Sequence, residues 1–385
     1  MFGWFSRLSL RRIITQGTFI PEVDGFRFLA ILIVILAHAW GLFGTPAVNR
    51  TLPLYLRREV VNGKVGVYLF FAISGFILAL PFAKTHLLHA RPVSLLRYFK
   101  RRVTRLEPPY VILMLLRFPL LLLYKHDSFK TMAPHLGASL LYLHNLIYGY
   151  SSVIYPAAWS LEIEVQFYIL APLLATIYTI KSTTLRQLLL IGLIIGTAVL
   201  SALLIVSGSR VSYSILNYFQ YFLAGFLLCD LYLTGNYLSI SSWLWDAVGI
   251  LSLLLILLSN GIFAAVIAPL AMISLYLSGF HGKLVRMFFS LPAITIIGGM
   301  CYSLYLTHML ALTSISSMVT HWPWMNSNHD LATLLEIGMC LSFALIVGTI
   351  YFVLIERPCM YPDWPSRLAK RVANILRAPS EEPAN

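Results

Sequence analysis

The sequence predicts an all-α protein, a polytopic membrane helix bundle with about ten transmembrane helices and one short interfacial or re-entrant segment. Of the 385 residues, 59% are hydrophobic and only 11% are charged. The mean hydropathy is +0.79. A soluble domain usually has about a quarter charged residues, because its surface faces water. Several apolar runs also reach the roughly 20 residues that a helix needs to cross hydrocarbon.

Apolar runs between charged or turn-forming residues give the candidate spans. They lie near 26–44, 64–83, 106–124, 158–180, 187–207, 213–233, 243–259, 261–280, 292–319 and 331–355. The run 135–150 is short and aromatic, so we expect it to lie at the interface or to re-enter without crossing. The expected organisation is an N-terminal tail over 1–25, a transmembrane domain over 26–356 and a C-terminal tail over 357–385.

The distribution of the net charge of +13 predicts the orientation of this bundle. Lys and Arg cluster in alternate loops, most densely in 84–105 and 357–377. Cytoplasmic loops of membrane proteins carry such an excess of basic residues. We therefore expect both termini in the cytoplasm and interpret the charge as topological, with no nucleic-acid partner.

Arg27 and His38 lie in the first predicted span, where ionisable side chains are candidates for function. They stand about three helical turns apart, so both project from one face, separated by roughly 16 Å along the axis. Asp24, one turn before Arg27, can pair with it or cap the helix start. The alternative is an Arg27 that reaches the interface and a His38 that is a hydrogen-bonded core residue.

Arg102 and Arg105 stand one turn apart in the basic run before the third span, whose start we expect at the Pro-Pro pair 108–109. Guanidinium groups at a helix entrance suit phosphate binding, because they are permanently charged and bind bidentately. The alternative is that these charges only set the topology.

Trp159, Ser160 and Glu164 open the fourth span. Ser160 and Glu164 share a helical face, whereas Glu162 points elsewhere. Because a carboxylate in an apolar helix is not expected to face lipid, we place Glu164 opposite His38. There it could orient the imidazole for general-base catalysis on a hydroxyl. A structural hydrogen bond between helices is the alternative.

Two further motifs contain ionisable residues. His308 ends the run Tyr-Ser-Leu-Tyr-Leu-Thr-His at 302–308, and Glu356 begins Glu-Arg-Pro at the end of the tenth span. The sequence contains no P-loop, dinucleotide fingerprint, zinc-protease motif or nucleophile elbow. We expect no metal site.

Six motifs in this order resemble the membrane-bound acyltransferase family three, bacterial O-acetyltransferases of surface polysaccharides and related acceptors. They are Val-Asp-Gly-Phe-Arg at 23–27 followed by His38, and the motifs at 66–76, 101–108, 159–168, 302–308 and 356–358. The resemblance covers about 21–358. Glu107 and the Ala-Ala pair at 157–158 depart from the family pattern, which bears on the acceptor side.

The resemblance implies an enzyme of the bacterial inner membrane that transfers an acyl group, usually acetyl, from cytoplasmic acyl-coenzyme A to a hydroxyl. The acceptor would be a saccharide, such as O-antigen, exopolysaccharide or a lipid-linked sugar, and membrane lipids would surround the enzyme. His38 matches the family's essential histidine, Arg27 its arginine partner, and Glu164 the glutamate of the Trp-Ser-Leu motif. Arg102 and Arg105 match the pair that engages coenzyme A. Acetyl-coenzyme A is then a donor substrate and not a permanently bound cofactor.

Two alternatives stay open at this stage. A transporter or flippase could use Arg27, His38, Glu164 and His308 as a substrate or proton path, although the inverted repeats common in transporters are not visible. An acyl-histidine intermediate is an alternative to direct transfer. No segment resembles the SGNH-type extracellular domain of some relatives, so we expect the acceptor to reach the bundle itself.

Overall fold

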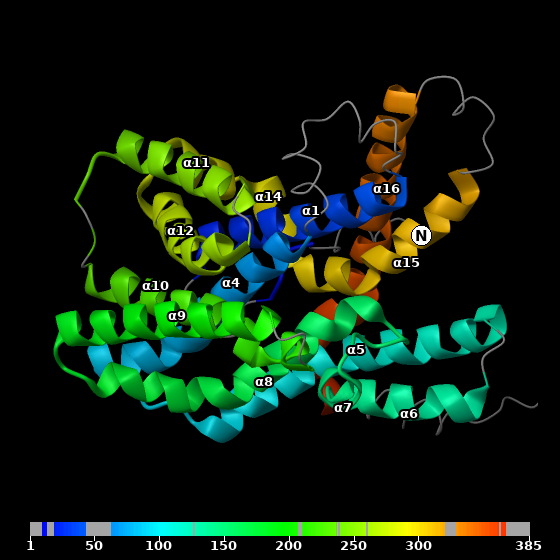
Figure 1. Ribbon diagram of the computed structural model, residues 1–385, viewed down its shortest axis with the longest axis horizontal. Coiled ribbons are helices and arrows are strands. Elements are labelled where there is room, and N and C mark those ends of the chain that lie inside the picture. Colours follow the sequence, from blue (N-terminus) through cyan, green and yellow to red (C-terminus); the bar gives the residue numbers. More distant parts are fainter. Residues whose placement is uncertain are drawn as a thin grey trace, which may run out of the picture.

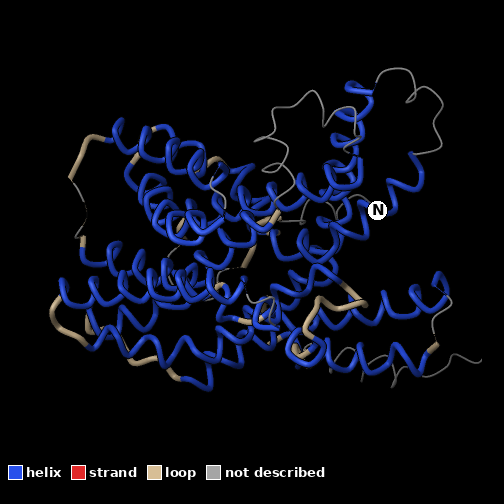
Figure 2. Tube along the Cα trace, in the orientation of Figure 1, coloured by secondary structure: helices blue, strands red, loops and turns tan. Residues whose placement is uncertain are grey.

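The computed structural model describes residues 10–13, 19–43, 63–125, 128–206, 210–235, 237, 239–258, 261–319, 329–361 and 363–366. Within these ranges every regular element is helical and no strand occurs (Figure 2). Most of the predicted tails, and most of the outer loop that follows the first span, lie outside the described residues.

The α-helices are α1 (Pro21–Phe43), α4 (Lys64–Leu87), α5 (Leu95–Lys125), α6 (Phe129–Leu140), α7 (His144–Tyr148), α8 (Trp159–Leu174), α9 (Thr183–Val206), α10 (Phe219–Thr234), α11 (Ser242–Leu258), α12 (Gly261–His281), α13 (Leu284–Phe289), α14 (Pro292–Gly299), α15 (Cys301–Val319), α16 (His329–Tyr351) and α17 (Arg357–Cys359). Short 3₁₀ segments are η2 (Pro156–Ala158), η3 (Ala175–Thr179), η4 (Arg210–Tyr213) and η5 (Ile215–Asn217). A π-helical turn, η7 (Phe352–Glu356), joins α16 to α17.

Six helical spans in the described part of the chain are long and apolar enough to cross a membrane, and the bent pair α14–α15 is a seventh candidate. The shorter apolar helices α10, α11 and α12 occupy the remaining predicted spans. The all-α polytopic architecture is therefore confirmed, whereas the count of ten stays a prediction. Helices α6 and α7 occupy much of the segment predicted at 135–150. With 12 residues, α6 is too short to cross hydrocarbon.

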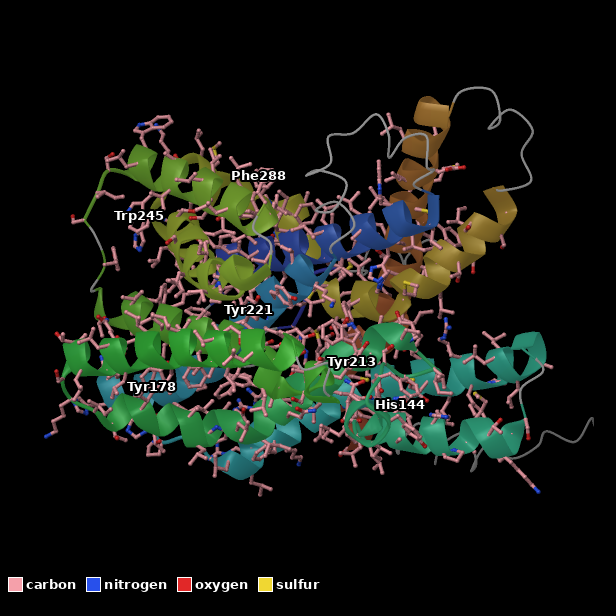
Figure 3. All side chains as sticks on the ribbon, viewed as in Figure 1. His144, Tyr178, Tyr213, Tyr221, Trp245 and Phe288 are labelled. Atoms are coloured by element: carbon pink, nitrogen blue, oxygen red, sulfur yellow. The ribbon has the colours of Figure 1, made fainter. Side chains whose placement is uncertain are left out.

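Helices α4 and α10 form the centre of the bundle (Figure 1). Gly75 of α4 and Gly225 of α10 each face the backbone of the other helix, with no room for a Cβ. Small residues of this kind let membrane helices approach closely. Beside this contact, Tyr221 of α10, which Figure 3 labels, stacks on Tyr68 of α4 with ring centroids 4.2 Å apart. The centre is therefore a tightly packed support for the helices around it.

The third span begins earlier than the sequence predicts. Helix α5 starts at Leu95 and continues through the Pro-Pro pair 108–109, the predicted start of the span. A proline inside a helix leaves the carbonyl four residues earlier without its usual donor. Here the indole Nε1 of Trp364 donates to the carbonyl of Thr104 at 2.8 Å. Because this carbonyl has another donor, the helix tolerates Pro108, and the basic run belongs to the helix.

The ninth span, predicted as continuous over 292–319, is two helices, α14 and α15, with a bend of 71° between them at Met300. Gly298 at the end of α14 lies against the backbone of Asp24 in α1, where a Cβ would not fit. This contact places α14 across α1, while α15 packs along α1 and α16 (Figure 1). Helix α1 itself begins at Pro21 and not at 26, so Asp24 lies within its first turns.

Candidate active site

Two histidines from different helices meet inside the bundle. His38 lies on α1 and His308 on α15, and their ring centroids are 5.0 Å apart with an interplanar angle of 67°. His308 is fully buried, whereas His38 is partly exposed. The structure thus brings together two residues that the sequence placed in separate motifs.

Backbone carbonyls determine which nitrogen of each ring carries a hydrogen. Nδ1 of His38 lies 2.8 Å from the carbonyl oxygen of Val34, and Nδ1 of His308 lies 2.7 Å from that of Tyr305. A carbonyl oxygen only accepts, so each Nδ1 must be the donor. In the neutral rings Nε2 therefore holds the lone pair. For His308 this nitrogen is buried and has no hydrogen-bond partner among the described residues.

Hydrogen bonds connect the turn that carries His308 to the beginning of α8. The hydroxyl of Tyr305 donates to the carbonyl of Ala157 at 2.6 Å and lies 2.6 Å from Oγ of Ser160. Because that hydroxyl has one hydrogen, Ser160 is the donor of the second bond. Tyr155 also donates to the carbonyl of Tyr305 at 3.1 Å. Ser160 is therefore connected to His308 through a single residue, Tyr305.

Trp159 and Glu162 belong to the other side of α8. The Trp159 ring packs 5.3 Å from the Tyr218 ring, and its carbonyl accepts from Nδ2 of Asn145 at 2.8 Å. The backbone N–H of Asn145 donates to Glu162 at 2.7 Å. Ser160 and Glu162 thus diverge as predicted, and Glu162 contacts α7, the helix of His144.

Glu164 has partners other than the expected one. Oγ of Ser74 donates to its Oε1 at 2.5 Å, and Glu164 lies within electrostatic range of Arg27 and Arg102. The structure shows no hydrogen bond between Glu164 and His38, whose Nδ1 instead uses a carbonyl of its own helix. A carbonyl four residues earlier in a helix is always close by, so an imidazole can be oriented without a carboxylate.

Five charged residues form a second group, the arginine cluster: Arg12, Asp24, Arg27, Arg105 and Glu356. Asp24 accepts from Nη1 of Arg27 through Oδ1 and from Nε of Arg12 through Oδ2, both at 2.7 Å. Nη2 of Arg105 lies 3.9 Å from Oε1 of Glu356, an ion pair too long for a hydrogen bond. The other oxygen of Glu356 accepts from the backbone and side chain of Ser303.

Arg12 is the member of this cluster that sequence reasoning missed. It precedes the first span, and no helical periodicity links it to Asp24. Burial is the main cause that lowers the pKa of Arg12 to about 10; repulsion from Arg27 acts in the same direction and attraction by Asp24 opposes it. The guanidinium is still protonated at neutral pH.

Arg102 lies beside the cluster between two tyrosines. Its Cζ is 3.6 Å from the ring centre of Tyr98 and 5.5 Å from that of Tyr168, and its Nη1 donates to the Tyr98 carbonyl at 2.8 Å. The Tyr98 hydroxyl in turn donates to the carbonyl of Tyr168 at 3.1 Å. Both aromatic contacts stabilise a cation in a fixed orientation. Tyr168 stands one turn after Glu164, so its position on that face was readable from the sequence.

Comparison with known proteins gives the family. The model of the acyltransferase domain matches residues 20–355. The chain belongs to acyltransferase family three. A protein of Staphylococcus aureus strain COL named "Putative O-acetyltransferase" is 26% identical over 328 residues, which cover 78% of this chain and 52% of that protein. O-acetyltransferase OatA of Staphylococcus aureus strain NCTC 8325 is 26% identical over 223 residues, 54% of this chain and 34% of OatA.

The comparisons also differ in how much of each protein they cover. The chain spans about half the length or less of the curated relatives that it matches. No solved structure matches it. What the match establishes is an acyltransferase domain over residues 20–355 of a helical membrane protein.

Proposed function

We propose that the protein transfers an acetyl group from cytoplasmic acetyl-coenzyme A to a hydroxyl of a saccharide acceptor at the bacterial inner membrane. The observation that carries the proposal is the tautomer of His38. Its Nδ1 donates to the Val34 carbonyl, so Nε2 of this partly exposed residue holds a lone pair inside an apolar bundle. A general base for a hydroxyl needs such a nitrogen.

The donor enters from the side of the arginine cluster in this proposal. Arg27, Arg102 and Arg105 supply permanently charged donors for the phosphates of coenzyme A. His38 lies about three turns farther along α1 than Arg27, roughly 16 Å along the axis. The thin pantetheine arm of the donor would bridge this distance and bring the thioester to His38. Asp24 and Glu164 position the arginines, and the termini are cytoplasmic.

The chemical step uses His38 twice. Nε2 takes the proton of the acceptor hydroxyl while its oxygen attacks the thioester carbon and forms the new C–O bond. The C–S bond then breaks, and the leaving coenzyme A sulfur takes the proton back from His38. Throughout, Nδ1–H keeps its bond to the Val34 carbonyl, which holds the ring and stabilises the imidazolium between the two transfers. The buried His308 packs against this ring and fixes its plane.

The acceptor class rests on the relatives and on the fold. The relatives are named as O-acetyltransferases, which supports a hydroxyl acceptor. The part of the chain that the structure describes consists of helices in one bundle, so the acceptor has to reach His38 within the membrane domain. A lipid-linked sugar does this because its lipid keeps the saccharide at the membrane.

The test uses inside-out membrane vesicles with radiolabelled acetyl-coenzyme A, and it measures label in the lipid-linked glycan fraction. His38→Gln should lower transfer by about 10²-fold or more at equal protein level, because the base is lost. His86→Gln, at an exposed position of α4, is the matched control and should transfer normally. Equal transfer by His38→Gln and wild type would contradict the role of His38. Absence of transfer by every variant would count against the donor or the acceptor.

A further inference from the structure

The arginines assigned to the donor are matched by carboxylates. Arg27 pairs with Asp24, and Arg105 pairs with Glu356. Arg102 has Glu164 within electrostatic range. Together these three pairs carry no net charge. A neutral group gives a polyanion little net attraction, although moving its phosphates out of water has a cost that must be offset.

Arg12 adds a fourth positive charge to these three arginines and three carboxylates. Its own partner, Asp24, is already paired with Arg27. Its Nε bonds the Asp24 oxygen that Arg27 leaves open, and it also interacts electrostatically with Arg27 and Arg105. The bond to Asp24 uses one of the five N–H donors of a guanidinium. The Arg12 side chain is 16% exposed, so it borders the surface of the cluster.

Two contacts hold Arg12 in place, one at the backbone of the next residue and one along its own side chain. The N–H of Ile13 donates to Sδ of Met360 at 3.4 Å, next to α17. Gly299, at the end of α14, lies beside the stem of Arg12: a Cβ there would be 3.6 Å from its Cβ and Cγ. The guanidinium is therefore positioned by packing before any ligand binds, which lowers the entropy cost of a contact.

We propose that Arg12 is a further donor-binding residue that contacts the phosphate groups of acyl-coenzyme A beside Arg27 and Arg105. The proposal rests on the proposed donor. Arg12 lies before residue 20, where the match to the family begins, so the assignment comes from the geometry of this chain. Its role is distinct from that of Asp24, which only positions the two guanidinium groups.

The first measurement is the Kd of coenzyme A for the purified full-length protein in detergent, at fixed salt. Arg12→Gln should weaken binding about tenfold, since it removes a charge-assisted hydrogen bond. Arg12→Lys keeps the charge and should lie between Arg12→Gln and wild type. The matched control is Arg11→Gln, which removes the same charge from the exposed neighbouring residue and should bind within twofold of wild type.

A ligand series separates a phosphate contact from a structural effect. The ratio of the Kd values of Arg12→Gln and wild type should shrink from coenzyme A through dephospho-coenzyme A to phosphopantetheine, as phosphates are removed. A ratio that stays constant along the series would overturn the proposal, because Arg12 would then act through the fold. A ratio of the two Kd values near one for coenzyme A would overturn the proposal as well.

The same data distinguish this inference from the proposed function. Wild-type protein that binds coenzyme A, with Arg12→Gln unchanged, rejects Arg12 alone and leaves the donor intact. Wild-type protein that binds no coenzyme A rejects the donor and Arg12 together. The unfolding temperature of ligand-free Arg12→Gln should stay within a few degrees of wild type; a large drop would assign Arg12 to folding.

Discussion

The molecule contains two groups of buried charge that are built in opposite ways. Between α9 and α10, Arg186 and Asp230 are almost fully inaccessible and bond each other. One donor on Nη1 and one on Nη2 of Arg186 reach the Ile180 carbonyl at 2.7 Å and the Thr183 hydroxyl at 3.4 Å. Gln187 donates to the second oxygen of Asp230 at 2.8 Å. This pair is closed, because each of its charged groups is satisfied by protein.

The arginine cluster is open, because its arginine side chains are partly exposed and some of its polar atoms have no hydrogen bond within the described residues. The side chains of Arg27 and Arg105 are 16% and 35% exposed. Nε of Arg105 and Oε1 of Glu356 are buried without a hydrogen bond among the described residues. A buried polar atom left without a partner costs free energy, so it needs an explanation. Under the proposed function, the closed charge stabilises the fold and the open charge binds the donor.

The largest effect is expected on the free energy of unfolding, when a substitution breaks the Arg186–Asp230 pair. Asp230→Ala leaves the guanidinium of Arg186 buried without its carboxylate, which should lower the free energy of unfolding by about 3–5 kcal/mol. Glu22→Gln is the control: it keeps the shape of the side chain and leaves unpaired only Arg286, which is 60% exposed, so it should cost less than about 1 kcal/mol. Both are measured by denaturant unfolding in detergent. Weaker coenzyme A binding by folded Asp230→Ala would contradict the comparison.

Next in size is a change in the open cluster. Arg105→Gln should weaken coenzyme A binding by about 10- to 100-fold, because charged hydrogen bonds to phosphate are lost. Its stability should change little, since the ion pair to Glu356 is long and the arginine is one-third exposed. Arg97→Gln, at an exposed position of the same helix, should bind normally. Titration with coenzyme A gives the Kd, and denaturant unfolding of the same preparations gives the stability. Loss of stability without loss of binding would reverse the assignment.

A smaller effect is expected at the turn that holds His308. Tyr305→Phe removes the hydroxyl that donates to Ala157 and accepts from Ser160. The free energy of unfolding should fall by about 1–2 kcal/mol. The transfer rate should fall several-fold because His308 loses its fixed position, while the Kd of coenzyme A stays the same. A changed Kd with an unchanged rate would show that this turn belongs to the donor site.

The smallest effect tests the space around His38. A Cβ on Gly63 would lie 3.0 Å from Cβ of Ala37 and 3.7 Å from Cε1 of His38. Gly63→Ala should therefore shift the ring slightly and lower kcat less than tenfold, without a change in coenzyme A binding. Gly41→Ala is the control, because a Cβ there meets nothing within 4 Å. Similar kcat values for both variants would mean that the ring position tolerates the shift.

Much of the fold could be predicted because lipid imposes a length and a composition on each span. The single-face spacing of Arg27 and His38 is likewise a property of one helix, and α1 contains both residues. The predicted helix ends were less accurate, because they depend on contacts with other parts of the chain. The carbonyl of Thr104 has the Trp364 indole as donor, so Pro108 does not end α5. The break at Met300 follows the Gly-Gly pair 298–299, a local signal for a helix end, and it is there that α14 packs on α1.

The partners of the site residues could be predicted only in part, for the same reason. Asp24 and Arg27 are one turn apart, so their pairing was expected and is observed. The bond from Ser74 to Glu164, the contact of His38 with His308 and the bond from Arg12 to Asp24 each join residues far apart along the chain or outside its periodic part. Such contacts depend on which helices become neighbours.

The bend between α14 and α15 has a consequence for the electrostatic field at Glu356. It exposes the first turn of α15 in the interior of the bundle, where the N–H and hydroxyl of Ser303 both bind one oxygen of Glu356. The partial positive charge at a helix start stabilises a carboxylate. Backbone dipoles thus carry part of the task of holding that negative charge. They neither titrate nor change with a side-chain substitution, and they leave the guanidinium of Arg105 available to an incoming anion.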